Sequence, residues 1–350
     1  SVVKTSDSTV MIRDEITGEM FPIKPKVIVN ASGAWIDHVN EVFGLREQYI
    51  GGTKGSHLVL NVPELKQAIG THEFFFENKD GRIVLILPFY DKVIVGTSDL
   101  PVTDVDHVVC TREEEDYFIE FVSHIFPTIK IKREDVVFRF SGVRPLEYSR
   151  AKTTGQISRD HSIKHDRFGG VPVLSLVGGK WTSFRAFSEQ ATDEVLELLG
   201  KSRKTGTEQL PVRGGDHYPA TRKEREALVR KIAGESNLEP AYVDELIQRY
   251  GSDASTAAEN INRLSREPLS TLPNWTRGEV AWLVRSEDVL HLDDLFLRRS
   301  SIAWLGSLNR EVLNEFAGIL ADELGWSEEK KAVEIQRTVE LMNTNHGVLL

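Results

Sequence analysis

The chain has 350 residues, more than one ordinary hydrophobic core organises, so we expect about two domains. Its net charge of -10 disfavours a nucleic-acid partner, because phosphodiester backbones attract basic proteins. The single cysteine, Cys110, excludes an internal disulfide framework and a multi-cysteine metal site. No run of about eighteen apolar residues is present, and the opening residues do not follow a signal-peptide pattern, so we expect no transmembrane segment.

The first thirty residues predict two kinds of strand. Short apolar runs alternate around a turn at Thr17-Gly18, which predicts a hairpin. The β-branched run at 27–29 ends in the small residues 30–33, a pattern typical of a buried parallel strand. Further strands are expected at 57–62, 82–90 and 92–99.

A helix is expected after residue 111. Thr111 and Glu114 have the spacing of a capping box, and apolar residues then recur at helical spacing as far as Pro127. Residues 136–146 are expected to be extended, and 171–177 predict a second buried strand.

The turn that follows this strand is the first candidate site. Gly178-Gly179-Lys180 leads into a helix of about twenty residues. Glycines let the backbone approach a ligand, and a helix start directs free N–H groups and a positive dipole end at it. Lys180 adds a full charge, and Thr182 or Ser183 can cap the helix. The turn therefore suits a group that gains negative charge, and the alternative is an ordinary strand–helix turn.

Three further motifs have a functional and a structural interpretation. Arg144 and Arg159 have the guanidinium forks that bind phosphate or carboxylate, although single arginines more often form surface ion pairs. His57, in the motif 54–57, could act as a base or bind an anion, or be a hydrogen-bonded structural residue. Residues 30–35 follow a parallel strand, where nucleotide sites of open sheets lie.

Other features predict no site. His291, Asp293 and Asp294 lie close in sequence without an obvious fourth ligand, which favours a solvated helix start over a metal site. Cys110 has no neighbour that would lower its pKa, so a catalytic thiol is not expected. We therefore expect no metal.

The chain changes character after the linker 210–216, and everything beyond it predicts helices. Thr276 with Glu279, and Ser327 before two glutamates, are typical helix starts. We expect an α/β part followed by a compact all-helical domain. The segments with helical periodicity are 220–234, 241–251, 255–265, 276–287, 312–325 and 327–342.

Taken together and in order, these segments resemble FAD-dependent glycerol-3-phosphate dehydrogenases of the D-amino-acid-oxidase-like superfamily. The resemblance covers essentially the whole chain and includes the 210–216 linker and the helices after it. The matching stretches are VIVNASGAWID (27–37), KGSHLVL (54–60), DGRIVLILPFYDKVIVGTSD (80–99), FSGVRPL (140–146), ISRDHSI (157–163) and VLSLVGGKWTSFR (173–185).

The resemblance implies a partial, Rossmann-like FAD-binding domain that is split in sequence. Residues 1–40 and 151–209 would be its parts, and 41–150 would form an inserted antiparallel substrate-binding sheet. Residues 210–350 would be the C-terminal helical domain.

The resemblance also assigns roles to residues. Arg144 and Arg159 would bind the substrate phosphate or orient its hydroxyls, and His57 would assist removal of the C2 hydroxyl proton. Lys180 and Thr182 would face the pyrimidine edge of the flavin. The residues expected to act in catalysis are His57, Arg144 and Lys180. Those expected to contact FAD are Ala31, Gly33, Gly178, Gly179, Lys180 and Thr182.

The implied reaction oxidises sn-glycerol 3-phosphate to dihydroxyacetone phosphate, with a hydride passing from C2 to flavin N5 and electrons going on to a quinone or respiratory-chain acceptor. Two alternatives stay open: a glycerol-3-phosphate oxidase that uses oxygen, and a non-catalytic interaction module. The resemblance implies a cytoplasmic protein, with attachment at the inner face of the membrane and a homodimer left open.

One departure from the family concerns its dinucleotide motif. The family begins with a G-x-G-x-x-G strand–turn–helix, and this sequence contains none. We therefore expect the chain to represent the C-terminal portion, to bind FAD poorly and to be inactive alone. Trp181 and Phe184, around the lysine motif, are smaller departures.

Overall fold

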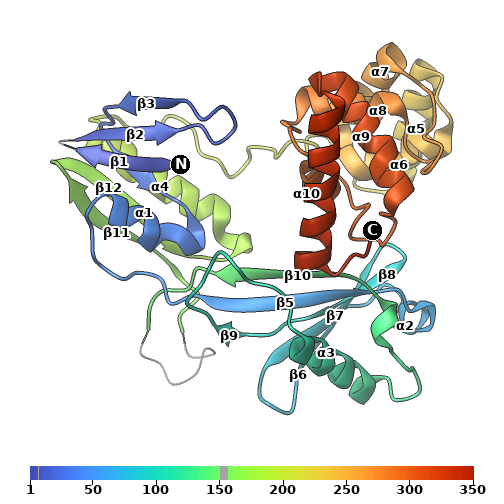
Figure 1. Ribbon diagram of the computed structural model, residues 1–350, viewed down its shortest axis with the longest axis horizontal. Helices are drawn as coiled ribbons and strands as arrows, with labels where there is room; N and C mark the ends of the chain where they lie inside the picture. The colour runs from blue at the N-terminus through green and yellow to red at the C-terminus, as the bar shows by residue number, and fades with distance from the viewer. Residues whose placement is uncertain (7, 150–156) are drawn as a thin grey trace.

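The computed structural model describes residues 1–6, 8–149 and 157–350, and the expected boundary at residue 150 lies outside this range. Three parts are visible in Figure 1. An N-terminal lobe combines residues 1–6 and 8–44 with 157–200, and a central sheet spans 50–146. A helical lobe follows from residue 220 to the C-terminus.

The N-terminal lobe opens with a three-stranded antiparallel sheet of β1 (Val2–Ser6), β2 (Thr9–Arg13) and β3 (Met20–Ile23). The predicted turn joins β2 to β3, where the amide of Gly18 donates to the carbonyl of Asp14 at 2.8 Å. The hairpin prediction is confirmed.

A second sheet has the order β11 (His161–Phe168), β12 (Val171–Gly178), β4 (Ile28–Asn30), and β4 runs parallel to β12 as predicted. Helices α1 (Ile36–Val42) and α4 (Phe184–Leu198) follow the two parallel strands. The expectation that the first of these strands is buried is wrong for Val29, whose side chain is 44% exposed. Among the described residues β4 pairs only with β12, so one edge of this strand has no partner strand.

A buried polar network fixes the end of β4. Asn30 Nδ2 donates to Asn40 Oδ1 at 2.8 Å and to the carbonyl of Ile36 at 2.9 Å. Asn40 in turn donates to Ser175 Oγ on β12 at 3.1 Å. Because these groups are buried and mutually hydrogen-bonded, they hold the 31–35 turn against the parallel strand.

The central sheet has the order β10–β5–β8–β7–β6, with β9 paired to β5, and every pairing is antiparallel. The predicted strands within residues 53–100 and the extended segment from residue 136 are confirmed. The strands are β5 (Thr53–Leu60), β6 (Phe74–Glu77), β7 (Ile83–Phe89), β8 (Lys92–Gly96), β9 (Leu100–Pro101) and β10 (Val136–Arg144).

One face of this sheet packs on α2 (Pro63–Ile69) and α3 (Arg112–Ile125) around a core that includes Phe118 and Phe121. The capping box is confirmed: the amide of Glu114 donates to Thr111 Oγ1 at 3.4 Å, and the Glu114 carboxylate accepts from the amide of Thr111 at 2.8 Å. The helix ends before Pro127 as predicted.

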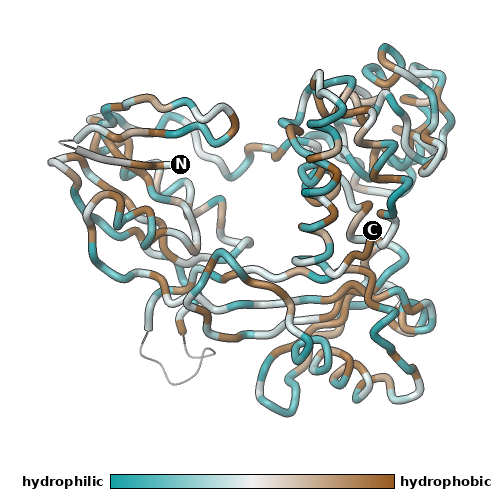
Figure 2. The backbone as a smooth tube through the Cα atoms, viewed as in Figure 1, coloured by the Kyte–Doolittle hydropathy of each residue, from teal (hydrophilic) through white to brown (hydrophobic). Residues whose placement is uncertain are grey.

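The helical lobe covers part of the opposite face of the sheet (Figure 1), as the common core that joins Val59 and Phe138 to the helices shows. Figure 2 shows apolar stretches along the strands of this sheet. The predicted starts at Thr276 and Ser327 are confirmed, because each side chain accepts from a backbone amide of the first turn. The elements are α5 (Arg222–Ser236), α6 (Pro240–Tyr250), α7 (Ala254–Leu264), α8 (Arg277–Ser286), the π-helical turn Asp294–Arg299, α9 (Arg310–Leu324) and α10 (Glu328–His346).

Trp304 connects the helical lobe to β10. Its ring centroid lies 4.8 Å from that of Phe138 and 4.7 Å from that of Phe140. The ring of His346, at the end of α10, stacks on Phe138 at 4.6 Å. An aromatic layer therefore joins the two parts of the molecule.

A buried ionic cluster holds α6 to α8. Glu279, which is fully buried, accepts from Arg249 Nη1 at 2.8 and 2.9 Å. The hydroxyls of Tyr242 and Tyr250 each donate to the same carboxylate at 2.7 Å. The carboxylate is therefore satisfied by three partners in a region that excludes water.

Replacing Glu279 with alanine is expected to lower the free energy of unfolding by about 3–5 kcal/mol, because Arg249 would lose its main buried counter-charge. Denaturant unfolding followed by circular dichroism measures this change. The control is Glu226→Ala, which removes an exposed pair with Arg222 on α5 and should change stability by less than about 1 kcal/mol. Equal effects of the two substitutions would contradict a structural role of the cluster.

Candidate functional site

A cavity of about 850 Å³ lies between the strand ends of the N-terminal lobe and the β5–β10 side of the central sheet. All residues predicted from the sequence to form the site line this cavity, except Thr182. The predicted residues among its lining are Ala31, Gly33, His57, Arg144, Arg159, Gly178, Gly179 and Lys180. Segments from four distant parts of the chain therefore meet at one place.

The parallel pair β4 and β12 supplies the first wall. Because parallel strands end at the same edge of a sheet, the turns after Asn30 and after Val177 lie together. Gly178 and Gly179 have φ angles of 75° and 93°, which glycine adopts readily. A Cβ on Gly178 would also lie 2.5 Å from the carbonyl oxygen of Asp160. The turn therefore requires glycine for both its conformation and its close packing.

The turn into α4 is closed by Ser183 and not by Thr182. The amide of Lys180 donates to Ser183 Oγ at 3.2 Å, and this hydroxyl donates back to the carbonyl of Lys180 at 3.1 Å. Lys180, Trp181 and Phe184 line the cavity beside this helix start. Thr182 is exposed and does not line the cavity, so its contact with a cofactor stays a prediction.

His57 on β5 faces the cavity and packs on a neighbouring ring. It stacks on Phe140, its cross-strand partner on β10, with 4.7 Å between ring centroids and 4° between planes. The imidazole occupies the space above Gly96, where a Cβ would lie 2.2 Å from the His57 ring. Gly96 therefore gives the ring its place on the sheet.

Burial lowers the pKa of His57 to about 4, and the positive charge of Arg144 adds to this effect. The imidazole is therefore neutral at physiological pH. Its Nδ1 is buried and makes no hydrogen bond to the described residues. A buried polar nitrogen without a partner is unusual in a folded protein, and here it belongs to a side chain that lines the cavity.

Arg144 lies flat across β5. A Cβ on Gly55 would fall 2.2 Å from a guanidinium nitrogen of Arg144, so the glycine makes room for this group. Arg144 Nη1 donates to Asp99 at 3.1 Å, and Nη2 donates to Thr97 Oγ1 at 2.8 Å. Burial lowers the pKa of Arg144, Asp99 opposes this shift, and the nearby charge of Arg159 adds to it. Two cations thus lie close together.

Only part of the motif 54–57 faces the cavity, because side chains alternate along a strand. Lys54 lies on the α3 side and donates to Glu114 at 2.7 Å. Glu114 also accepts from Ser98 Oγ at 2.5 Å, and Ser98 accepts from the amide of Ser56 at 2.9 Å. These bonds fix the segment that carries Thr97 and Asp99.

Sequence reasoning missed Gly55, Gly96, Thr97 and Asp99 as parts of the site. The available signal was a glycine in the middle of a strand, which often marks close approach of another group. The cross-strand register needed to name that group could not be read from the sequence.

The charge of the lining indicates which kind of ligand the cavity can bind. Arg144, Arg159 and Lys180 line it, and no aspartate or glutamate occurs among its described lining residues. The apolar part of the wall includes Leu176 and Phe187. A pocket of this kind suits an anion together with a flat or apolar body.

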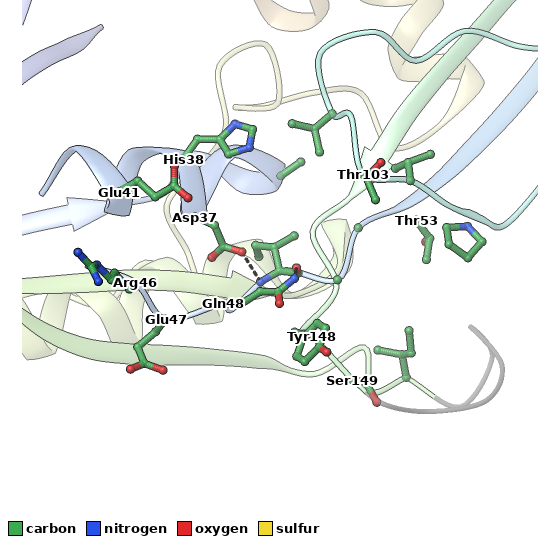
Figure 3. A pocket seen from close by; sticks show the side chains of 18 residues that line it. Asp37, His38, Glu41, Arg46, Glu47, Gln48, Thr53, Thr103, Tyr148 and Ser149 are labelled. Atoms are coloured by element: carbon green, nitrogen blue, oxygen red, sulfur yellow. Dashed lines mark hydrogen bonds between the residues drawn. The ribbon is translucent and has the colours of Figure 1, made fainter. Parts of the chain in front are cut away.

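A second cavity, of about 630 Å³, is lined by Asp37, Glu41 and Glu47 as well as His38 and Arg46 (Figure 3). The carboxylate of Asp37 accepts from the backbone amides of residues 49 and 50, each at 3.0 Å. None of the predicted site residues lines it. Its excess of carboxylates makes it the poorer place for an anion.

The structure shows the surroundings of three residues for which the sequence predicts no functional site. Burial raises the pKa of Cys110 to about 12, which agrees with the expectation that it is not a catalytic thiol. The expected solvated helix start is wrong for Asp293, which is buried and ion-paired with Arg298 and Arg337. His291 contacts Glu334 at 3.0 Å. Packing of α10 on this turn caused the difference.

The described residues lack two features that other proteins use to bind metals or membranes. No group of three or more histidine, cysteine, aspartate or glutamate side chains is placed to hold a metal ion. Across residues 1–6, 8–149 and 157–350, no helix has both the length and the apolar character needed to span a bilayer.

Comparison with known proteins identifies the family of this chain. Residues 4–185, more than half of the chain, match the FAD dependent oxidoreductase family. The chain belongs to this family. Residues 205–331 match the C-terminal domain of alpha-glycerophosphate oxidase.

The chain is similar to several curated proteins of the family. It is 30% identical to a glycerol-3-phosphate dehydrogenase from Synechocystis, over 95% of this chain and 62% of the relative. It is 29% identical to an aerobic glycerol-3-phosphate dehydrogenase from Staphylococcus aureus, over 91% of this chain and 58% of the relative. The chain thus spans about three-fifths of the length of these relatives.

A solved structure supports the fold. The glycerol-3-phosphate dehydrogenase of Bacillus halodurans, determined in complex with FAD, superposes with a TM-score of 0.83 at 23% identity. The match covers 99% of this chain and 68% of that protein. The expected fold class, an α/β flavoprotein part with an inserted antiparallel sheet and a C-terminal helical part, is confirmed.

The state of His57 gives a direct test of the geometry. In an NMR titration of the folded protein, the imidazole of His57 should titrate near pH 4, whereas a histidine in the unfolded chain titrates near pH 6.5. Between these values the unfolded chain takes up a proton that the native chain does not, so the free energy of unfolding should fall as pH drops from 6.5 to 4. His57→Gln should remove this part of the pH dependence. A native midpoint near 6.5 would contradict the buried, cation-facing placement.

Proposed function

We propose that this chain carries the substrate site of an FAD-dependent enzyme that oxidises sn-glycerol 3-phosphate to dihydroxyacetone phosphate. The observation that carries the proposal is the cavity whose lining combines Arg144, Arg159 and Lys180 with a neutral His57 and holds no carboxylate among its described residues. The names of the relatives and the FAD in the Bacillus halodurans structure support the same substrate and cofactor.

The residues present fit the flavin part of FAD. Gly178 and Gly179 give the β12 turn its positive-φ backbone, and this turn lines the cavity in which a flat ring system would bind. The start of α4 and Lys180 provide positive charge beside this turn, and Ala31 and Gly33 leave the neighbouring turn open. When bound, FAD would supply the two-electron acceptor for oxidation at C2.

The arginines are proposed to hold the phosphate. Arg144 is oriented in advance by Asp99 and Thr97, so little side-chain freedom is lost when an anion binds. Arg159 lines the same cavity and adds a second positive charge. A dianionic phosphate at this place would relieve the repulsion between the two cations.

His57 is proposed to take the proton of the C2 hydroxyl. Its ring is neutral and the residue lines the cavity, so the imidazole can accept a proton from a ligand bound there. A pKa near 4 makes the free imidazole a weak base. A phosphate bound at Arg144 would offset the charge that helps to depress this pKa, so substrate binding would make His57 a better proton acceptor.

The position of this site suggests a role for each part of the chain. We assign residues 1–40 and 151–209 to the flavin-binding part and 41–150 to the substrate-binding sheet. Residues 210–350 are proposed to support the sheet, because Trp304 packs on Phe140, which carries the His57 ring.

For the electron acceptor we propose a quinone of a respiratory chain, with the protein at the membrane surface. Support comes from the name of the Staphylococcus aureus relative, an aerobic glycerol-3-phosphate dehydrogenase. Molecular oxygen is the second candidate, because residues 205–331 match a domain of alpha-glycerophosphate oxidase. Peroxide release during turnover would identify the oxidase, and reduction of a soluble quinone analogue without peroxide would identify the dehydrogenase.

The reaction is tested with the complete gene product that carries this chain, purified with its flavin and kept free of oxygen. Addition of glycerol 3-phosphate should bleach the oxidised flavin absorbance and release dihydroxyacetone phosphate in a one-to-one ratio. Glycerol without the phosphate serves as the control and should reduce the flavin far more slowly. A flavin that stays oxidised with glycerol 3-phosphate would exclude this substrate.

Arg144→Ala should weaken the affinity for glycerol 3-phosphate by about 10- to 100-fold, which is the range for losing a charged hydrogen-bonding partner. Flavin content should stay close to that of the wild type. Arg167→Ala is the control, because Arg167 is exposed on β11 and does not line the cavity. Equal loss of flavin and of substrate affinity in Arg144→Ala would show that this arginine is structural.

A further inference from the structure

Gly142 is an exposed residue of β10 that lines the cavity. It lies opposite Gly55 in the antiparallel register of β10 and β5, so two glycines face each other in the floor of the cavity. The space above Gly55 is filled by the guanidinium of Arg144. The space above Gly142 is open, because a Cβ built there meets no atom within 4 Å.

Neither the backbone nor the packing explains a glycine at this position. Gly142 does not adopt a positive φ, so a residue with a side chain could take its conformation. Within a strand, glycine is less favourable than alanine by about 0.5–1 kcal/mol. Gly55 and Gly96 differ from Gly142, since a Cβ at either would collide with Arg144 or His57. What Gly142 provides is empty space.

The open space lies beside both groups that would act on the substrate, because Gly142 is opposite Gly55, which the guanidinium covers, and next to the Phe140–His57 pair in the register. Phe140, Gly142 and Arg144 alternate along β10 and therefore share a face, and Phe140 carries the ring of His57. Positions two apart on a strand are separated by about 6.6 Å, which is room for a short carbon chain between the guanidinium and the imidazole.

We propose that Gly142 is a specificity-determining residue whose missing side chain makes room for the carbon chain of a three-carbon phosphate ester. The phosphate binds at Arg144 and Arg159, and the carbon chain crosses β10 over Gly142 toward His57. This inference rests on the proposed function and adds the position that limits the size of the substrate.

The test compares Gly142→Ala and Gly142→Val with the wild type in the complete, flavin-loaded gene product. Binding is measured by calorimetry with dihydroxyacetone phosphate, which cannot reduce the oxidised flavin, and with inorganic phosphate. Flavin content and the thermal midpoint are measured on the same samples. The control is Gly234→Ala on α5, another exposed glycine at which a Cβ meets no atom within 4 Å.

Gly142→Ala should weaken the affinity for dihydroxyacetone phosphate by about 10-fold or more, the scale of one misplaced methyl group in a fitted pocket. Gly142→Val should weaken it further. Phosphate affinity and flavin content should match the wild type for Gly142→Ala, and its thermal midpoint should not fall, because alanine is favoured over glycine within a strand. Gly234→Ala should leave both ligand affinities and the flavin content at the wild-type level. This combination separates a steric block from a folding defect.

Unchanged affinity for dihydroxyacetone phosphate in Gly142→Ala would overturn the inference, and so would a loss of flavin or of the thermal midpoint that accompanies weaker binding. If the wild type and Gly142→Ala both bind dihydroxyacetone phosphate equally well and are both reduced by glycerol 3-phosphate, only the proposed role of Gly142 is excluded. Wild-type protein that does neither would remove the proposed function itself.

Discussion

The alternation of side chains along β5 is the constraint on which the rest of the structure depends. The side chain of Lys54 points toward α3 and donates to Glu114. The amide of Ser56 donates to Ser98, which in turn donates to Glu114 and so holds the segment that follows β8. Gly55 and His57 lie on the opposite face of the strand, where both line the cavity. A shift of one residue in the pairing of β5 would exchange these two sets and place Ser56 or Leu58 where the imidazole lies. The buried Lys54–Glu114 pair opposes such a shift, because neither charge could be left alone in the core.

The cavity obtains its chemistry as much from missing side chains as from present ones. Gly55 and Gly96 give space to Arg144 and His57, and these groups could not lie on the sheet beside larger residues. Hydrogen bonds from Arg144 to the segment after β8 then fix the guanidinium before any ligand arrives. Preorganisation of this kind reduces the entropy lost on binding. The site is therefore built by the backbone and the register of the sheet.

The sequence predicted what depends on local pattern. The strand at 171–177 and the capping box at Thr111 were recognisable because their signals lie within a few neighbouring residues. The meeting of Arg144 and Lys180 was reached only through the resemblance to a family. What sequence reasoning missed depends on contacts across strands or between lobes: the burial of Asp293, and the part played by Asp99. Those contacts are set by register and packing, which no short window of sequence contains.

The aromatic layer formed by Phe138, Phe140, Trp304 and His346 has a consequence for how this molecule could be divided or recombined. The layer seals one end of the sheet face and continues directly into the ring of His57. If the helical lobe were replaced by that of another protein, this aromatic stack would be exposed to water unless the new lobe also placed a tryptophan at the position of Trp304. The helical lobe is thus part of the wall that keeps the imidazole of His57 dry.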